Sequence, residues 1–335
     1  MKSSALICTA QQEFSLQEFN IPSLGSKDLL VRCAWSGVSV GTEFAVVRNK
    51  INYGPYPICT GYQAVGYVED TGSDIEKFAP GDKVYYRRNY IPMTRNGQPL
   101  TVCSGTHASY ALMPEDAEVE HLPADVDDAT AALFVMPSVG YNAVDMAGVQ
   151  MGDVVAFHAV GLIGLGALAA ARLRGAVTIA IDLNPKRLEM AVEMGAEYTI
   201  NPSGLTPDEL VERVQAIQPG GADVVFEGSG VPACLDLAFP LARLRGKFVF
   251  LGHYGKEPVS FNYLVPHGKQ LTAFFPCNDG LATCRAAVLR NIATGAIPWE
   301  KTITHRVAAS ESPDLYTKIN REELPDLFGA VIRWS

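Results

Sequence analysis

The chain has 335 residues, enough for two domains of ordinary size, and its 48% hydrophobic and 19% charged residues are typical of a compact globular protein. The formal net charge of −9 disfavours nucleic acids and anionic membranes as partners, because neither attracts an acidic surface. The seven cysteines are scattered, odd in number and without a Cys-x-x-Cys pair, which favours reduced thiols over disulfides and offers no zinc-site spacing.

In chain order, the first residues lack the long apolar core and cleavage site of a signal peptide, and we therefore expect a cytoplasmic protein. The first third is rich in β-branched and aromatic residues, with turns such as Pro80-Gly-Asp82 between the apolar runs. Short strands at this spacing predict a small β-barrel-like domain. The expected strands are Leu29–Ser36, Ala64–Glu69, Lys83–Tyr86 and Ala108–Met113.

From about Ala129 the pattern changes to alternating strands and helices, which predicts an α/β domain with a doubly wound parallel sheet. The expected strands are Val154–Phe157, Val177–Asp182, Tyr198–Ile200, Asp223–Glu227, Phe248–Leu251 and Leu271–Phe275, and the expected helices between them are Leu188–Met194, Pro207–Ala216 and Leu235–Ala242. The last sixty or so residues are expected to hold a helix near Cys284–Thr294 and a closing segment, Leu327–Trp334, that returns to the first domain.

The segment from Val154 to Asp182 is the most informative, because it joins an apolar strand, a glycine turn, a helix expected from about Leu165, and a second strand. Gly161 lacks a Cβ, so that a pyrophosphate can approach the backbone, and Gly164 lets the helix pack closely on the strand. The helix N-terminus attracts the phosphate anion. Asp182 is placed to bind the ribose hydroxyls and to repel a 2′-phosphate, which favours NAD over NADP. Ala159 replaces the usual first glycine of this pattern.

Further landmarks accompany this turn in a specific order, and with them the chain resembles the medium-chain dehydrogenase/reductase superfamily over nearly its whole length. The landmarks are Ser36-Gly-Val-Ser-Val-Gly-Thr-Glu43, Thr60-Gly-Tyr-Gln-Ala-Val-Gly-Tyr-Val68, Phe78-Ala-Pro-Gly-Asp-Lys-Val84, Gly105-Thr-His-Ala-Ser-Tyr110, Gly140-Tyr-Asn-Ala-Val144 and Gly221-Ala-Asp-Val-Val-Phe-Glu-Gly-Ser-Gly230. The resemblance implies a GroES-like β-barrel catalytic domain over residues 1–136 and 275–335. It also implies a Rossmann NAD-binding domain over residues 137–274.

The sequence departs from the zinc-dependent members of this superfamily at the metal positions. Their Cys-Gly-Thr-Asp is here Val40-Gly-Thr-Glu43, and their Gly-His-Glu is here Gly61-Tyr-Gln63. Valine and tyrosine supply neither the thiolate nor the imidazole that holds zinc, and the four-cysteine loop of a structural zinc is reduced to Cys103. We therefore expect no metal. The metal-free pattern and the tryptophan near the C-terminus resemble the bacteriochlorophyllide dehydrogenase branch and related sugar or polyol oxidoreductases.

Without zinc, hydrogen-bond donors must stabilise the oxygen of the reacting alcohol. Thr42 matches the superfamily's proton-relay hydroxyl, and its alternative role is a threonine that caps a turn. Tyr62 replaces a metal-ligand histidine and is expected to act as a donor or general acid, with neighbours lowering its pKa. The alternative is that Tyr62 only fills the space left by the absent metal. Glu43 is a candidate base or a group that orients Tyr62, and His107 is a candidate proton shuttle or a buried core histidine.

The resemblance also implies a set of cofactor contacts, in which His253 lines the nicotinamide and His158 packs in the fingerprint strand or contacts the cofactor. The expected cofactor-binding residues are Gly161, Leu162, Ile163, Gly164, Asp182, Arg187, Ser229, Gly252 and His253.

The leading functional hypothesis is an NAD-dependent, zinc-independent dehydrogenase that oxidises a secondary alcohol of a small hydroxylated substrate such as a polyol or sugar. One alternative is a metal-free enoyl or quinone reductase, a class that usually uses NADPH, against which Asp182 counts. The other is a catalytically silent NAD-binding relative. The resemblance implies a homodimer or homotetramer.

Overall fold

A computed structural model describes all residues from Met1 to Ser335. The chain forms two compact units, each with its own core. The first unit comprises residues 1–134, 292–294 and 300–335, and the second comprises residues 135–291 and 295–299. The second unit so defined continues to residue 291, whereas the sequence led us to expect a return to the first domain at residue 275.

The first unit is built on mostly antiparallel sheets. A seven-stranded sheet has the order β11-β6-β5-β3-β19-β18 with β10 beside β3, a four-stranded sheet has the order β2-β1-β4-β9, and β7 pairs with β8. The bounds are β1 Lys2–Cys8, β2 Phe14–Asn20, β3 Asp28–Val38, β4 Ile58–Cys59, β5 Ala64–Thr71, β6 Lys83–Tyr86, β7 Thr94–Arg95, β8 Gln98–Pro99, β9 Thr101–Val102, β10 Tyr110–Pro114, β11 Val119–His121, β18 Ile303–Ala308 and β19 Gly329–Arg333.

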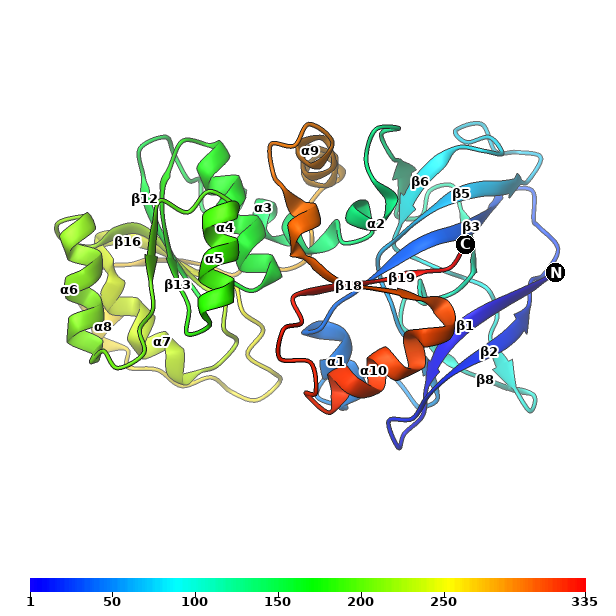
Figure 1. The fold of residues 1–335 in the computed structure, drawn as a ribbon, viewed down its shortest axis with the longest axis horizontal. Helices are drawn as coiled ribbons and strands as arrows, with labels where there is room; N and C mark the ends of the chain where they lie inside the picture. The colour runs from blue at the N-terminus through cyan, green and yellow to red at the C-terminus, as the bar shows by residue number, and fades with distance from the viewer. The chain divides into compact units, whose positions relative to one another are not determined.

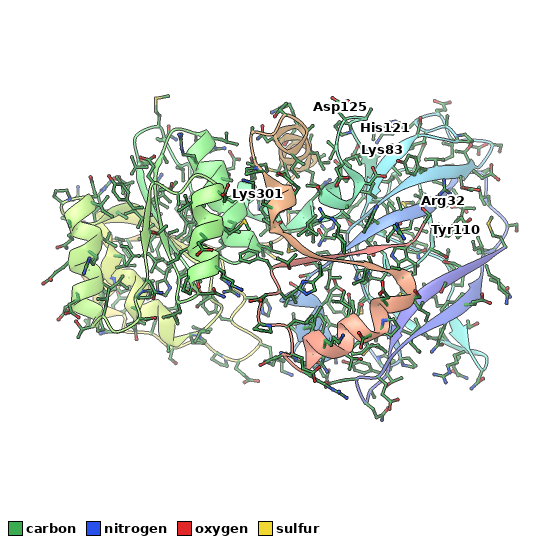
Figure 2. All side chains as sticks on the ribbon, in the orientation of Figure 1. Arg32, Lys83, Tyr110, His121, Asp125 and Lys301 are labelled. Atoms are coloured by element: carbon green, nitrogen blue, oxygen red, sulfur yellow. The ribbon has the colours of Figure 1, made fainter.

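The C-terminal strand joins the larger sheet, where Figure 1 shows the red β19 beside the blue β3. β19 pairs antiparallel with β3, with Ala330 opposite Val38, so the expected return of the closing segment to the first domain is present. On the same side of β3, nearer its start, Arg32 lies opposite Tyr110 of β10, and both side chains are labelled in Figure 2. The strand expected over Leu29–Ser36 is longer in the structure, because its buried apolar residues continue to Val38.

Three short α-helices complete the first unit: α1 Thr42–Val47, α2 Asp128–Ala131 and α10 Ser312–Asn320. Lys83, also labelled in Figure 2, joins β6 to α2 through an ion pair of 2.7 Å with Asp128 and a hydrogen bond of 2.5 Å to the carbonyl of Val126. The sequence analysis did not anticipate α10. This helix packs with α1 in one apolar core, which includes Phe44 and Tyr316.

The second unit contains a six-stranded sheet of order β14-β13-β12-β15-β16-β17, in which every pair is parallel. Figure 1 shows α4 and α5 on one face and α6, α7 and α8 on the other, which is the expected doubly wound arrangement. The strands are β12 Val154–His158, β13 Val177–Ile181, β14 Tyr198–Ile200, β15 Ala222–Glu227, β16 Ala242–Phe250 and β17 Thr272–Phe274, and the helices are α3 Val135–Met146, α4 Leu162–Leu173, α5 Pro185–Glu193, α6 Pro207–Ile217, α7 Ala233–Ala238, α8 Leu264–Gly268 and α9 Ala282–Ala293.

Local sequence signals set several of these helix starts. Asn184 caps α5, with Pro185 in its first turn, and Thr206 forms a capping box with Glu209 at the start of α6. The helix expected over Leu235–Ala242 ends earlier, because α7 passes into a 3₁₀ turn at Phe239–Leu241 and the chain then enters β16 at Ala242. None of the helices combines the length and the apolar character needed to cross a membrane.

Candidate active and cofactor sites

The turn between β12 and α4 carries the glycine fingerprint. α4 begins at Leu162, three residues before the expected start, and Gly161 is its N-cap residue in an extended conformation (φ −66°, ψ −176°). No side chain caps this helix. The amides of Leu162, Ile163 and Gly164 lie in the first turn, where the helix itself supplies no carbonyl acceptors. These donors form a suitable site for a pyrophosphate group.

The two glycines of this turn have different surroundings. A Cβ added at Gly161 would meet no atom within 4 Å, so the space above the turn is open. A Cβ added at Gly164 would lie 2.6 Å from the carbonyl oxygen of Ala159, too close for any side chain without movement of the backbone. Gly161 therefore leaves room for a ligand, whereas Gly164 allows close packing of helix on strand. Both observations fit a bound dinucleotide.

Asp182 directly follows β13 and is only 7% exposed. Its carboxylate accepts hydrogen bonds from the amides of Val160 and Asn184, both at 2.9 Å, so it is tied to the glycine turn. Each carboxylate oxygen can still accept a ribose hydroxyl. The guanidinium of Arg187 lies 3.6 Å from the same carboxylate and is partly exposed. Asp182, whose carboxylate would repel a 2′-phosphate, and Arg187, whose guanidinium would attract it, are therefore neighbours.

The remaining expected cofactor residues lie after β15 and β16. A Cβ on Gly252 would lie 2.5 Å from the amide nitrogen of Gly230, so the loops that contain Ser229 and His253 are in close contact. The amide of Val231 donates to the Ser229 hydroxyl at 3.1 Å. A Cβ on Gly228 would lie 3.0 Å from the Ala159 carbonyl, which places this pair of loops beside the glycine turn. The structure thus gathers these residues where parallel strands end, which is the usual ligand edge of such sheets.

A buried carboxylate at this edge was not identified from the sequence. Glu227 is fully buried and accepts hydrogen bonds from the Ser229 amide at 3.0 Å and from the Tyr254 hydroxyl, and His158 Nδ1 lies 3.4 Å from it. Burial alone would raise the pKa of the Glu227 carboxyl, but the hydrogen bonds from His158, Ser229 and Tyr254 outweigh it and hold the pKa below its usual value. The contact with Glu227 gives a reason for a polar residue, His158, inside the otherwise apolar fingerprint strand.

One group of three potential metal-ligating side chains occurs in the structure: His158, Glu227 and Cys234, whose ligand atoms lie within 4.8 Å of one another. The Glu227 oxygens already have protein donors, which stabilise its negative charge. Val40 stands where the zinc-dependent members have a cysteine ligand. Its side chain packs against the apolar core that contains Phe44.

The candidate catalytic turn is formed by residues 39–43, at the start of α1. The Glu43 carboxylate accepts from the Ser39 amide at 2.8 Å, and the Glu43 amide donates to the Ser39 carbonyl at 3.2 Å. Thr42 is exposed, whereas Ser39 and Glu43 are buried. The side chains of Ser39 and Thr42 lie close enough to the phenol of Tyr62 to lower its pKa. The sequence-predicted pair Thr42 and Tyr62 is therefore brought together.

The phenol of Tyr62 has a raised pKa, which corrects the expectation that its neighbours would lower it. Burial is the largest cause, and it exceeds the opposing effects of the Ser39 and Thr42 hydrogen bonds and of the nearby Arg87 charge. Arg87 lies over the Tyr62 ring, with its guanidinium carbon 5.7 Å from the ring centre. Tyr62 thus stays protonated at neutral pH and is a hydrogen-bond donor.

Glu43 and His107 lie behind this turn in a buried cluster with Tyr316, a residue that the sequence analysis did not identify. His107 Nε2 lies 2.9 Å from the Glu43 carboxylate, and the Tyr316 hydroxyl lies 2.7 Å from the same oxygen and 2.6 Å from His107 Nε2. His107 and Tyr316 are fully buried and Glu43 is 3% exposed. Direct contact of Glu43 or His107 with a substrate is therefore disfavoured, and an indirect role fits the geometry.

The charge of Glu43 is stabilised within this cluster. Burial would raise the pKa of the Glu43 carboxyl, but the charge and hydrogen bond of His107, the Ser39 amide and the Tyr316 hydroxyl together keep it below its usual value. The cluster extends from His107 Nδ1 to the Ser36 hydroxyl at 2.7 Å, and the Trp334 indole donates to that hydroxyl at 2.8 Å. The C-terminal tryptophan noted in the sequence thus takes part in this network.

Comparison with known families matches both units. Residues 25–124 match the model of the alcohol dehydrogenase GroES-like domain, and residues 163–294 match the model of the zinc-binding dehydrogenase domain. Sorbitol dehydrogenase 1 of Saccharomyces cerevisiae is 30% identical over 280 residues, which covers 78% of this chain and 77% of the relative. Erythritol/L-threitol dehydrogenase of Mycolicibacterium smegmatis is 24% identical over 344 residues, with 92% of each chain covered.

Solved structures show the same fold. A putative zinc-binding dehydrogenase from Sinorhizobium meliloti 1021, bound to NADP, superposes with a TM-score of 0.86 at 25% identity and covers 99% of both chains. The alcohol dehydrogenase TADH from Thermus sp. ATN1 superposes with a TM-score of 0.81 at 27% identity, with 98% of this chain and 99% of that chain covered. These matches confirm the expected combination of a GroES-like domain and a Rossmann-type parallel-sheet domain.

Proposed function

Because this chain belongs to the medium-chain dehydrogenase/reductase superfamily that includes the alcohol and sorbitol dehydrogenases, we propose that it is an NAD-dependent, zinc-independent dehydrogenase. Its substrate would be a polyol, a sugar or a similar compound with a secondary alcohol. The names of its relatives, which include sorbitol and erythritol/L-threitol dehydrogenases, support oxidation of a hydroxylated small molecule.

The proposal depends most on Tyr62, which stands where the zinc-dependent members have a ligand histidine. Its phenol lies near the side chains of Ser39 and Thr42. A protonated phenol in a fixed position can donate a hydrogen bond to the substrate oxygen and stabilise the negative charge that develops on it. Thr42 is exposed and can pass the proton between this oxygen and water.

The second unit supplies the cofactor site of this proposal. The amides of Leu162, Ile163 and Gly164 would hold the pyrophosphate, and Asp182 would accept hydrogen bonds from the ribose hydroxyls. Ser229, Gly252 and His253 would line the nicotinamide end. When bound, the nicotinamide accepts the hydride from the substrate carbon. Asp182 supports NAD over NADP, although a relative binds NADP and Arg187 is close by.

The decisive experiment is a screen for NADH production from NAD⁺ with polyols, sugars, sugar acids and hydrophobic alcohols, run with and without 1,10-phenanthroline. We expect turnover with at least one polyol or sugar that the chelator does not change, in protein that contains no stoichiometric metal. Loss of activity with the chelator and recovery with Zn²⁺ would refute zinc independence. A strong preference for NADPH, with reduction of enones or quinones, would favour the reductase alternative. Tight NADH binding without any turnover would favour a catalytically silent relative.

We also propose that the protein works as a homodimer or homotetramer, as the superfamily resemblance implies. Light scattering of the purified protein tests this directly, and a single species at the 36.1 kDa mass of one chain would contradict it.

A further inference from the structure

Tyr316 of α10 is 273 residues from Glu43 in the sequence, yet its hydroxyl closes a triangle with the two buried candidate residues Glu43 and His107. The ring is already well packed, with its centre 5.4 Å from Phe14 and 5.2 Å from Phe44. Packing therefore explains an aromatic residue at this position but not the hydroxyl, which a phenylalanine would lack. The reason for the hydroxyl must therefore lie in its hydrogen bonds with Glu43 and His107.

The donors and acceptors around this triangle fit an assignment with a neutral His107. The Trp334 indole donates to the Ser36 oxygen, and the Ser36 hydroxyl can then donate to His107 Nδ1. The His107 hydrogen is then on Nε2, from which it points to the Glu43 carboxylate and the Tyr316 oxygen. The Tyr316 hydroxyl donates to Glu43. The tautomer follows from this network of neighbours.

The Glu43 carboxylate connects this buried cluster to the candidate catalytic turn. One carboxylate oxygen faces Tyr316 and His107, while the other accepts from the Ser39 amide. The side chains of Ser39 and Thr42 in turn lie near the Tyr62 phenol. The rotamer of Glu43 therefore holds the Ser39 amide, and with it the backbone of this turn.

We propose that Tyr316 is a positioning residue, whose hydroxyl fixes Glu43 and His107 and thereby the turn that aligns Thr42 and Tyr62. This inference rests on the proposed function for its catalytic consequence, but the physical connection can be measured without a substrate. The other titratable groups that influence this region are Cys59 and Cys103, which interact with Glu43, and Arg87, which interacts with Tyr62. Burial raises the pKa of both thiols, so they carry no charge at neutral pH.

The test compares Tyr316→Phe with Tyr86→Phe. Tyr86 is a suitable control because it is also fully buried in the first unit and its hydroxyl has no hydrogen-bond partner. The nearby Cys33 thiol only helps burial to raise the pKa of this hydroxyl. With a substrate found by the screen, we expect Tyr316→Phe to lower kcat at least tenfold with a much smaller change in KM, and Tyr86→Phe to leave both unchanged.

The pH profile separates positioning from a general loss of stability. Tyr316 is one of the groups that lower the pKa of Glu43, so its removal should move the acid limb of kcat to higher pH, whereas Tyr86→Phe should not. If Tyr316→Phe keeps the wild-type kcat and pH profile, the positioning role is wrong and the hydroxyl is only structural.

A second measurement does not depend on turnover. We expect amide hydrogen exchange at Ser39 to become at least tenfold faster in Tyr316→Phe and in Glu43→Gln, but not in Tyr86→Phe. In ¹⁵N spectra, wild-type His107 should carry its hydrogen on Nε2. If no alcohol is oxidised, the proposed function fails, while faster exchange at Ser39 would still support the connection from Tyr316 to the turn. Unchanged exchange in both variants, or a hydrogen on Nδ1, would overturn the inference.

Discussion

A Cβ on Gly164 would stand 2.6 Å from the carbonyl oxygen of Ala159, whereas a Cβ on Gly161 would meet nothing within 4 Å. The two glycines of one turn are thus required for different reasons. Gly164 is needed for the fold, since its neighbour is backbone that cannot move independently. Gly161 is needed only if a ligand approaches the turn.

Substitution of each glycine by alanine should separate these roles. Gly164→Ala should lower the free energy of unfolding by about 1–3 kcal/mol, because the new methyl group overpacks the turn. Gly161→Ala should lower stability by no more than about 1 kcal/mol, the usual effect of alanine at an N-cap, and weaken NADH binding at least tenfold. Urea unfolding and NADH fluorescence titration measure the two effects. Unchanged NADH affinity in Gly161→Ala would argue against a pyrophosphate at this turn.

Ala159 has a left-handed backbone conformation, with φ of +72°. This conformation costs a residue with a side chain about 1–2 kcal/mol, while glycine loses about 0.5–1 kcal/mol through the greater freedom of its unfolded chain. Ala159→Gly should therefore stabilise the protein by about 0.5–1 kcal/mol. Ala156→Gly, in the preceding strand β12, serves as the control and should destabilise. A lower melting temperature for Ala159→Gly would show that the methyl group makes a favourable contact.

The sequence predicted the second unit well because its signals are local. The apolar strands, the Asn184 and Thr206 caps and the glycine turn each lie within a few residues of the structure that they determine. Thr42 and Tyr62 were both named as candidates from their places in the superfamily's motifs, and their catalytic roles stay predictions.

The buried clusters could not be predicted from the sequence, because their contacts join residues that are far apart in the chain. Tyr316 meets Glu43 across 273 residues, and no local pattern in the helix that carries it predicts this contact. The pKa of Tyr62 was misjudged because its direction depends on burial, which a sequence motif does not reveal. His107 could be named as a candidate, but only the structure shows that it is fully buried.

Asp182 and Arg187 should control the choice between NAD and NADP. Asp182→Ser removes the negative charge next to the ribose, and we expect weaker NADH binding and tighter NADPH binding, each by about tenfold, or about 1.4 kcal/mol. Arg187→Ala in the Asp182→Ser background should then reverse the gain for NADPH, because the guanidinium lies 3.6 Å from the carboxylate in the wild type. Fluorescence titration with both cofactors measures this. Equal affinities of all variants for NADPH would exclude Asp182 as the selectivity residue.

Tyr62→Phe should lower kcat by about 100- to 1,000-fold, as expected for loss of a donor to a developing oxyanion. Thr42→Val should lower it by about 100-fold, because it interrupts proton transfer to water. Tyr90→Phe is a suitable control, since Tyr90 is 56% exposed. Steady-state kinetics on the substrate found in the screen give the comparison. Undiminished turnover in the Tyr62→Phe and Thr42→Val double variant would show that the catalytic assignment is wrong.

The acid stability of the second unit should depend on Tyr254 through Glu227. The folded-state pKa of Glu227 is lowered, so the stabilisation from its charge is complete above the ordinary value of 4.5 and is lost as the pH falls through the lower folded value. His158, Ser229 and Tyr254 face this carboxylate, and the Cys234 thiol lies near Tyr254.

Tyr254→Phe removes one of these donors and should lower the free energy of unfolding at pH 7 by about 1.5–3 kcal/mol, the usual contribution of a hydrogen bond to a charged group. The difference from wild type should shrink below pH 4.5, where the carboxyl becomes protonated. Tyr198→Phe, at a residue 44% exposed, should show no difference at any pH. Urea unfolding at several pH values between 3 and 8 is the measurement. A loss in Tyr254→Phe that stays constant over this range would mean that Glu227 is not the ionised partner of Tyr254.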